Sequence, residues 1–212
     1  MSKTERLVYQ EYNRLAPIYD SRWRNYLDRS LSFLLDFADI SSQASILDLA
    51  CGTGELARFI LEKNPQQNIT GVDISPTMLK IAQDKLEDYF QVKLFNTSAT
   101  ALPFDSQSFD LIICANAFHY FENPSVALAE IKRVLKPNGK LIILDWSGDY
   151  WVLKLLNPLF KFIDPAYQQC YKQKKLAILL VNADFYPVEA SKVRFSFIWE
   201  LIAISSCAKL IK

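Results

Sequence analysis

A glycine turn flanked by two carboxylates is the pattern in this sequence with the clearest chemical meaning. Asp48 precedes Gly52-Thr53-Gly54, and Asp73 follows the turn by about 20 residues. Glycines allow positive φ and let another molecule approach the main chain. A helix that starts at such a turn has unpaired N–H groups and a favourable dipole, so it suits a polar or anionic, nucleotide-like ligand. Asp48 favours a different ligand class, because a carboxylate there repels a pyrophosphate and suits a cationic group.

His119 is the only histidine of the chain. It follows a very apolar stretch, residues 109–115, that is typical of a strand covered on both faces. Histidine exchanges protons near neutral pH, so His119 is a candidate general base. A structural or ligand-flanking role is the alternative.

The elements that must position these residues alternate between strand and helix. The apolar pattern predicts strands over about 45–50, 68–73, 91–96, 109–115 and 140–145, and helices over about 54–62, 75–86 and 126–135. Ser75 is expected to cap the second of these helices, and Pro137-Asn138-Gly139 to end the third. Two further strands, about 187–195 and 197–207, are separated by too few residues for a crossover helix, so they should pair antiparallel.

This order predicts an α/β fold. We expect a Rossmann-like, doubly wound, mostly parallel seven-stranded sheet with an antiparallel C-terminal strand, helices on both faces and an N-terminal helical lid. Ligands of such sheets bind at the carboxyl ends of the strands. Residues 48–54, Asp73, 98–100 and 114–116 all lie at or just past predicted strand ends, so they should share one crevice.

The two flanks are rich in aromatic and aliphatic residues. Residues 3–38 read as two helices, with a break over about 15–19 caused by Pro17. Tyr19-Asp20 either packs on the core or folds over a ligand as a lid. Residues 146–171 form an apolar insert, followed by a helix over about 172–183. The insert either closes the pocket or contacts a membrane surface through side chains such as Trp151 and Leu155.

Length, charge and cysteine usage bound the remaining possibilities. The 212 residues carry a formal net charge of +1, which gives no electrostatic case for a nucleic-acid partner. No apolar run is long enough to span a bilayer, and the first residues do not resemble a signal peptide. The four cysteines are scattered without metal-ligand spacing, so we expect a cytoplasmic, reduced protein without a metal.

The turn also matches the dinucleotide fingerprint. Gly52, Gly54 and Ala57 fit G-x-G-x-x-G/A, and Asp73 has the required spacing. An NAD(P)-dependent oxidoreductase is therefore a real alternative. The carboxylate at Asp48, the short chain and the antiparallel C-terminal pair all argue against it.

The ordered motifs resemble those of class I S-adenosylmethionine-dependent methyltransferases, in the small-molecule branch (methyltransferase type 11) that includes ubiquinone and menaquinone biosynthesis enzymes. The motifs are Asp48–Gly54, Asp73–Leu79, Ala101–Phe104, Ser108–Asp110 and Glu130–Gly139. We expect one methyltransferase domain over 1–212, comprising a helical cap (1–40), a cofactor-binding core (45–145), the insert (146–171) and a C-terminal helix and strand pair (172–212).

The resemblance implies a role for each site residue. Asp48 would serve the methionine ammonium of the cofactor, directly or through water, and Asp73 the ribose hydroxyls. Ile74 and Met78 would sandwich the adenine. Ala99 would donate its N–H to the adenine, and Asn116 would lie by the methionyl end. The expected cofactor-binding residues are Asp48, Ala50, Cys51, Gly52, Thr53, Gly54, Asp73, Ile74, Met78, Ser98, Ala99, Asn116 and Tyr19.

Two positions depart from the family pattern. Ala50 replaces its first glycine, and we expect little effect because alanine is small and often tolerated in a strand. Ser98 stands where the family often has an acid, and a hydroxyl would contact the adenine amino group more weakly than a charged partner.

Methyl transfer to a small, hydrophobic or aromatic acceptor, with S-adenosylhomocysteine as product, is therefore the expected reaction, and the protein is expected to be a monomer or homodimer. A methyltransferase-like binding protein without activity is the second alternative.

Overall fold

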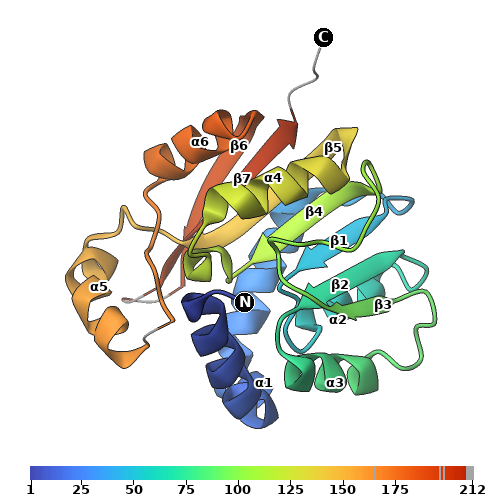
Figure 1. Cartoon of the computed structure of the whole chain (residues 1–212), viewed down its shortest axis with the longest axis horizontal. Helices are drawn as coiled ribbons and strands as arrows, with labels where there is room; N and C mark the ends of the chain where they lie inside the picture. Colours follow the sequence, from blue (N-terminus) through green and yellow to red (C-terminus); the bar gives the residue numbers. More distant parts are fainter. Residues whose placement is uncertain (165, 196, 198, 209–212) are drawn as a thin grey trace.

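The computed structural model describes residues 1–164, 166–195, 197 and 199–208, and shows a seven-stranded sheet with helices on both sides (Figure 1). The strand order is β3-β2-β1-β4-β5-β7-β6. Strands β1 to β5 pair in parallel, whereas β7 pairs antiparallel with both β5 and β6. The predicted doubly wound sheet with an antiparallel C-terminal strand is confirmed.

The element boundaries lie close to those expected from the apolar pattern. The strands are β1 (Ile46–Leu49), β2 (Ile69–Asp73), β3 (Lys93–Asn96), β4 (Phe109–Ala115), β5 (Leu135–Trp146), β6 (Phe185–Arg194) and β7 (Glu200–Ala208). The helices are α1 (Lys3–Ala38), α2 (Glu55–Lys63), α3 (Pro76–Lys85), α4 (Pro124–Val134), α5 (Trp151–Ile163) and α6 (Gln173–Asn182), with a 3₁₀ turn, η1, over Phe118–Tyr120. Ser75 caps α3 as predicted, since its hydroxyl accepts from Met78 N.

Successive side chains of the central strands pack into two separate hydrophobic cores, because side chains along a strand point alternately to the two faces of the sheet. Ile46 and Ile113 join a cluster with α1 and α2, while Leu47 and Ile112 join a cluster with α4 and α6. Helix α4 lies in front of the sheet in Figure 1. The helix layers hold the strand ends in register, and those ends carry the predicted site residues.

Helix α1 corrects the prediction of two N-terminal helices. It runs unbroken over Lys3–Ala38 with Pro17 inside it. A proline inside a helix removes one backbone hydrogen bond and costs about 3 kcal/mol. Here Pro17 is exposed while its neighbour Ala16 is buried, and the start of the helix is secured by a capping box between Ser2 and Glu5. Packing and capping therefore override the local signal.

Strand β5 begins earlier than predicted. Helix α4 ends at Val134 and β5 starts at Leu135, so Pro137-Asn138-Gly139 lies inside the strand and does not end the helix. The β4–β5 register shifts between Phe109 and Leu111, which accommodates the extra residues as an irregularity.

Candidate functional site

A cavity of about 640 Å³ lies where β1, β2 and β4 end, and the first half of α1 forms one of its walls. Nine of the predicted site residues line it: Tyr19, Ala50, Gly52, Asp73, Ile74, Met78, Ser98, Ala99 and Asn116. The crevice predicted at the strand ends is therefore present. Asp48, Cys51, Thr53, Gly54 and His119 are not among its lining residues.

Asp73 ties the end of β2 to the glycine turn. Its Oδ2 accepts from Gly52 N at 2.9 Å, and its Oδ1 accepts from Ser75 N at 2.8 Å. Burial raises the pKa of Asp73, although these backbone hydrogen bonds act in the opposite direction. Because the Gly52 N–H is already engaged by a carboxylate, this turn offers one donor fewer to a phosphate than an unoccupied glycine loop.

Left-handed backbone occurs at several positions around the cavity. Gly52 has φ +54° and Gly54 has φ +79°, and a Cβ at Gly52 would meet no atom within 4 Å. Ala50 also has φ +62°, and it lies just after β1. The expectation that Ala50 sits in a strand is therefore wrong, since its backbone is one that alanine adopts at a cost of about 1–2 kcal/mol. Such strain typically marks functional sites.

Asp48 lies beneath the turn, within β1. Its side chain is 2% exposed, and no hydrogen-bond donor of the described residues reaches its Oδ2. Burial, with a smaller contribution from the charge of Asp73, raises the pKa of Asp48 to about 8. A buried carboxylate oxygen without a partner is costly, and a cation or other donor beside it would relieve that cost. This arrangement suits a cationic ligand group and disfavours an anionic one.

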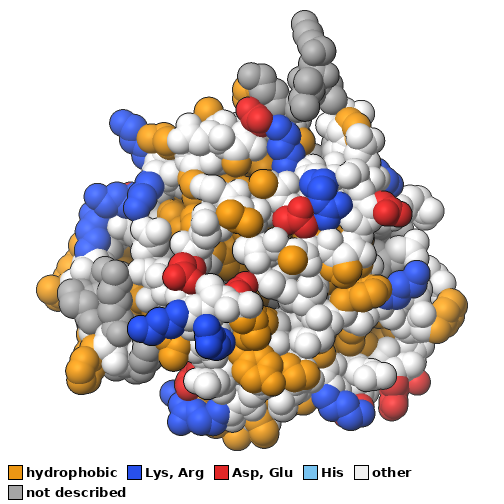
Figure 2. Space-filling view, viewed as in Figure 1, with side chains coloured by type: hydrophobic (Ala, Val, Ile, Leu, Met, Phe, Trp, Pro, Cys, Tyr) orange, Lys and Arg blue, Asp and Glu red, His pale blue; other side chains and the backbone are white. Residues whose placement is uncertain are grey.

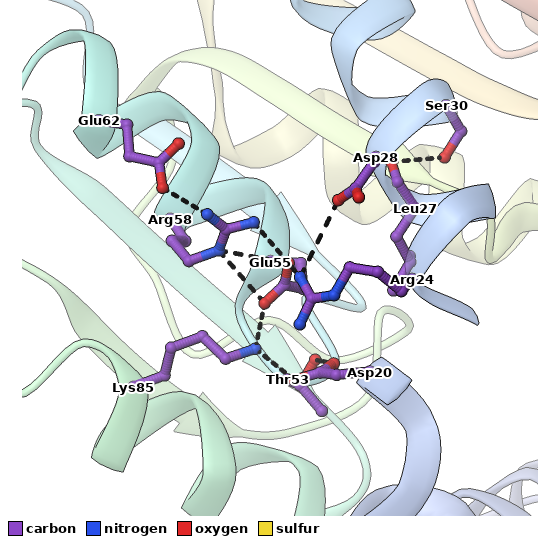
Figure 3. Close-up of polar contacts among 10 residues, drawn as sticks. All are labelled: Asp20, Arg24, Leu27, Asp28, Ser30, Thr53, Glu55, Arg58, Glu62 and Lys85. Atoms are coloured by element: carbon purple, nitrogen blue, oxygen red, sulfur yellow. Dashed lines mark hydrogen bonds and ion pairs between the residues drawn. The ribbon is translucent and has the colours of Figure 1, made fainter. Parts of the chain in front are cut away.

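Hydrogen bonds from Thr53 and Lys85 to Asp20, here called the clasp, fix α1 to the glycine turn (Figure 3). Thr53 Oγ1 donates to Asp20 Oδ1 at 2.6 Å, and Lys85 Nζ donates to Asp20 Oδ2 at 2.7 Å. Lys85 also bonds Glu55, and Arg24 Nη1 reaches Glu55 Oε2 at 3.1 Å. Asp20 thus fixes this part of α1, and the neighbouring Tyr19 lines the cavity.

Asn116 marks the other side of the cavity, at the end of β4. Its Oδ1 accepts from Tyr26 OH at 2.7 Å, and Tyr26 OH accepts from Trp146 Nε1 at 2.9 Å. This chain links the cavity wall to an aromatic group in which Trp146 contacts Phe160 and Trp199. Tyr26, Trp146, Phe160 and Trp199 are not among the residues that line the cavity.

His119 forms a buried dyad with Asp145. Nδ1 of His119 lies 2.6 Å from Asp145 Oδ1, and the backbone N of His119 donates to Asp145 Oδ2 at 2.8 Å. The imidazole ring stacks on Trp146, with ring centroids 4.4 Å apart. Its Nε2 is buried and has no hydrogen-bond partner among the described residues. Asp145 therefore holds Nδ1 as the donor and leaves the Nε2 lone pair available.

The dyad lies directly behind the cavity wall. Ala117 and Tyr120, on either side of His119 in the sequence, line the cavity, whereas His119 is 2% exposed and does not. The imidazole is covered by Tyr120 and Tyr167, whose ring centroids lie 4.2 Å and 5.7 Å from its own. Since Nε2 is buried, a reacting group would reach it only after a neighbouring side chain shifts.

Three residues that the sequence analysis did not single out belong to this region. Glu5 and Tyr12 of α1 line the cavity, and Asp145 orients His119. The spacing Ser2-x-x-Glu5 is a capping-box pattern, and it could have indicated that the Glu5 side chain turns back to the backbone N–H of Ser2. Asp145 ends a parallel strand, which is where side chains of ligand sites concentrate.

Comparisons with known proteins agree with this geometry. The family model of the methyltransferase domain matches residues 47–143. The chain is 37% identical over 145 residues to a demethylmenaquinone methyltransferase of Thermus thermophilus, and the match covers 64% of each chain. Matches to three such enzymes cover 60–64% of their lengths, so the chain spans less than two thirds of these relatives.

Solved structures share the fold at lower identity. A chain in the complex of the Haloferax volcanii Trm112 methyltransferase activator with a methyltransferase has a TM-score of 0.81 at 18% identity, covering 94% of this chain and 98% of that one. A Burkholderia thailandensis 1,6-didemethyltoxoflavin-N1-methyltransferase, with its substrate and S-adenosylhomocysteine bound, has a TM-score of 0.75 at 17% identity, covering 96% and 88%.

Proposed function

We propose that the protein transfers a methyl group from S-adenosylmethionine to a small hydrophobic or aromatic acceptor, because the family model of the methyltransferase domain matches residues 47–143. The observation that carries the proposal is the pair of buried carboxylates, Asp48 and Asp73, on either side of an open glycine turn. The Thermus relative is named for demethylmenaquinone. We infer an acceptor of that aromatic class.

The residues fit this cofactor. The unpartnered oxygen of Asp48 would serve the methionine ammonium, directly or through water, and Asp73 would accept from the ribose hydroxyls. Buried Met78 and half-buried Ile74 supply apolar walls for the adenine. When bound, the sulfonium supplies an electrophilic methyl group, and the protein supplies position and electrostatics.

The His119–Asp145 dyad would take a proton from an acceptor that loses one as it attacks. Asp145 holds Nδ1 of the imidazole, so the proton would be taken at Nε2. Stacking against Trp146 fixes the orientation of the His119 imidazole.

Binding selectivity tests the proposed cofactor. We expect calorimetry to detect S-adenosylmethionine and S-adenosylhomocysteine and no NAD, because a pyrophosphate at the turn would approach the Asp73 carboxylate, which already engages the Gly52 N–H. Asp73→Ala should weaken S-adenosylhomocysteine binding by at least about 100-fold, since ribose contacts and the Gly52 anchor are lost together. Selective binding of NAD would contradict the proposal. Cofactor binding without methylation of a broad acceptor panel would favour the inactive alternative.

An exposed apolar stripe on α5 favours contact with a membrane surface. Trp151, Leu155, Leu159 and Phe162 are 59%, 71%, 48% and 85% exposed. They recur every three or four residues, so they share one helix face, and hydrophobic side chains reach the surface over α5 at the left rim of Figure 2. Helix α5 contains lysines and no acidic residue. No helix in the described ranges has the length and apolar character to cross a bilayer. We infer that α5 lies on an anionic membrane that supplies the apolar acceptor.

Flotation with phosphatidylcholine–phosphatidylserine vesicles tests this contact. We expect the protein to float with the vesicles, and the double substitution Leu155→Glu, Phe162→Glu to reduce the bound fraction more than about 10-fold by removing apolar burial. Ile178→Glu is a matched control, because Ile178 is similarly exposed on α6, and it should float normally. A wild-type protein that stays wholly in solution would contradict membrane contact.

A further inference from the structure

Glu5 is a carboxylate of the cavity wall that comes from α1 and not from the sheet. Resting on the proposed cofactor, we propose that Glu5 is the group that selects the adenine base, by accepting a hydrogen bond from its 6-amino group. The inference assigns a specificity role to the first turn of α1.

The carboxylate of Glu5 is held in place by contacts on both of its oxygens. Ser98 Oγ donates to Oε1, with Thr100 Oγ1 nearby at 3.4 Å. Ser2 N donates to Oε2 at 2.6 Å, within the capping box. The side chain keeps 23% of its surface exposed. Glu5 is therefore fixed across the gap between α1 and the loop after β3, and it still faces the cavity.

The charge of Glu5 suits a hydrogen-bond donor on the ligand. Burial acts to raise the pKa of Glu5, but the hydrogen bonds from Ser98 and Ser2 outweigh it and the pKa is lowered. An ionised carboxylate accepts hydrogen bonds only, and each oxygen has more than one lone-pair site. A ligand group in front of it is favoured when it donates and repelled when it presents an oxygen.

Ser98 is already committed to other protein groups. Its hydroxyl hydrogen points at Glu5, and its oxygen accepts from Thr100 N at 3.1 Å. The acceptor in this corner of the cavity is therefore Glu5, with Ser98 as the group that orients it. This replaces the weak adenine contact expected for Ser98 with a charge-assisted one.

The position of Glu5 in the cavity points to the base and not to the ribose or the methionine. Glu5 contacts Ser98 and Thr100, and Val8, Ala99, Ile74 and Met78 line the same cavity. The carboxylate of Asp73 reaches back to the glycine turn after β1, whereas Glu5 bonds Ser98 after the edge strand β3. In Figure 1 the start of α1 lies beside the strand ends, which brings the chain terminus to the site.

A deaminated ligand tests the assignment. S-inosylhomocysteine differs from S-adenosylhomocysteine at two adjacent positions of the base, since it carries a 6-oxo group in place of the 6-amino group and a proton on N1 in place of a lone pair. We expect wild-type protein to bind the adenosyl ligand at least about 10-fold more tightly, because the 6-oxo oxygen faces a carboxylate. In Glu5→Gln the side-chain amide can donate, so the preference should fall by about 10-fold or reverse.

Controls separate this inference from the proposed function. Glutamine is accepted in a capping box, so Glu5→Gln should keep α1 intact. Glu11→Gln removes another acid of α1, which pairs with Arg14 and does not line the cavity, and it should leave the preference unchanged. A wild-type preference that persists in Glu5→Gln contradicts the role of Glu5 alone. Failure of wild-type protein to bind S-adenosylhomocysteine contradicts the proposed function itself.

Discussion

Asp48→Asn should stabilise the ligand-free protein at pH 8 and leave its stability nearly unchanged at pH 4. Burial raises the pKa of Asp48 to about 8, against an ordinary value near 3.9 in the unfolded chain. Below pH 4 both states hold the proton, so the group has no effect on pH dependence. Between pH 4 and pH 8 the unfolded state ionises while the folded state does not, so stability falls. The accumulated loss is on the order of 5 kcal/mol, and Asn removes it.

The measurement is the free energy of unfolding from urea titrations at pH 4, 6 and 8. Wild-type protein should lose stability across this range relative to Asp48→Asn, and the two curves should converge at low pH. Cys51→Ala is a useful control. Cys51 is a buried neighbour of Asp48, and burial raises the pKa of its thiol well above the ordinary value, so the thiol stays protonated from pH 4 to pH 8. Parallel pH profiles for wild type and Asp48→Asn would contradict a raised pKa at Asp48.

The same substitution should weaken cofactor binding by at least about 100-fold, because the methionine ammonium loses its carboxylate. In wild-type protein, S-adenosylmethionine affinity should rise by up to about 10-fold per pH unit between pH 6 and 7.5, as binding drives ionisation of Asp48. Calorimetry in buffers of different ionisation enthalpy would register the released proton. A flat profile in wild type would contradict the ammonium contact.

Replacing His119 should lower the rate of methyl transfer without removing cofactor binding. General-base catalysis typically contributes 10²–10⁴-fold, so His119→Ala should reduce kcat by about that factor. His119→Asn is the informative companion, because its amide can still donate to Asp145 in the place of Nδ1 while Nε2 is absent. Both variants should lose rate, and S-adenosylhomocysteine affinity should change by less than about 2-fold.

Asp145→Asn completes this test. An amide can donate to Nδ1 and so favours the wrong tautomer, which should lower kcat without altering the stacking of His119 on Trp146. Methyl transfer by His119→Ala at the wild-type rate would remove the base from the mechanism.

The sheet was predictable because its signals are local. Alternating apolar runs, short connections and the Ser75-Pro76 cap identify each element without reference to its neighbours. The errors arise where distant packing overrides a local rule. Pro17 predicts a break, yet the capping box and buried face of α1 keep one helix. Likewise, Pro137 and Gly139 predict the end of a helix at this point, yet both lie inside β5, where the β4–β5 register shifts.

The site residues that lie at strand ends were predictable from the sequence. Asp73 and Asn116 lie on the cavity because parallel strands bring their carboxyl ends to one edge. The place of Glu5 in the cavity wall could not be assigned from the sequence, because its pairing with Ser98 joins residues 93 positions apart. The buried state of His119 was equally hidden, since it depends on how the insert and Trp146 pack over it.

The clasp between Asp20, Thr53 and Lys85 has a consequence for how long a ligand stays bound. One wall of the cavity belongs to α1, so the residence time of a ligand depends on how often that helix lifts from the sheet. Between the clasp and the Glu5–Ser98 contact lies Pro17, where the helix ladder lacks a hydrogen bond. Asn13, also before Pro17, accepts from Ser75 Oγ at 2.7 Å. A bound ligand would therefore leave when the Glu5 and Asn13 contacts break and this part of α1 moves, while the clasped half stays docked.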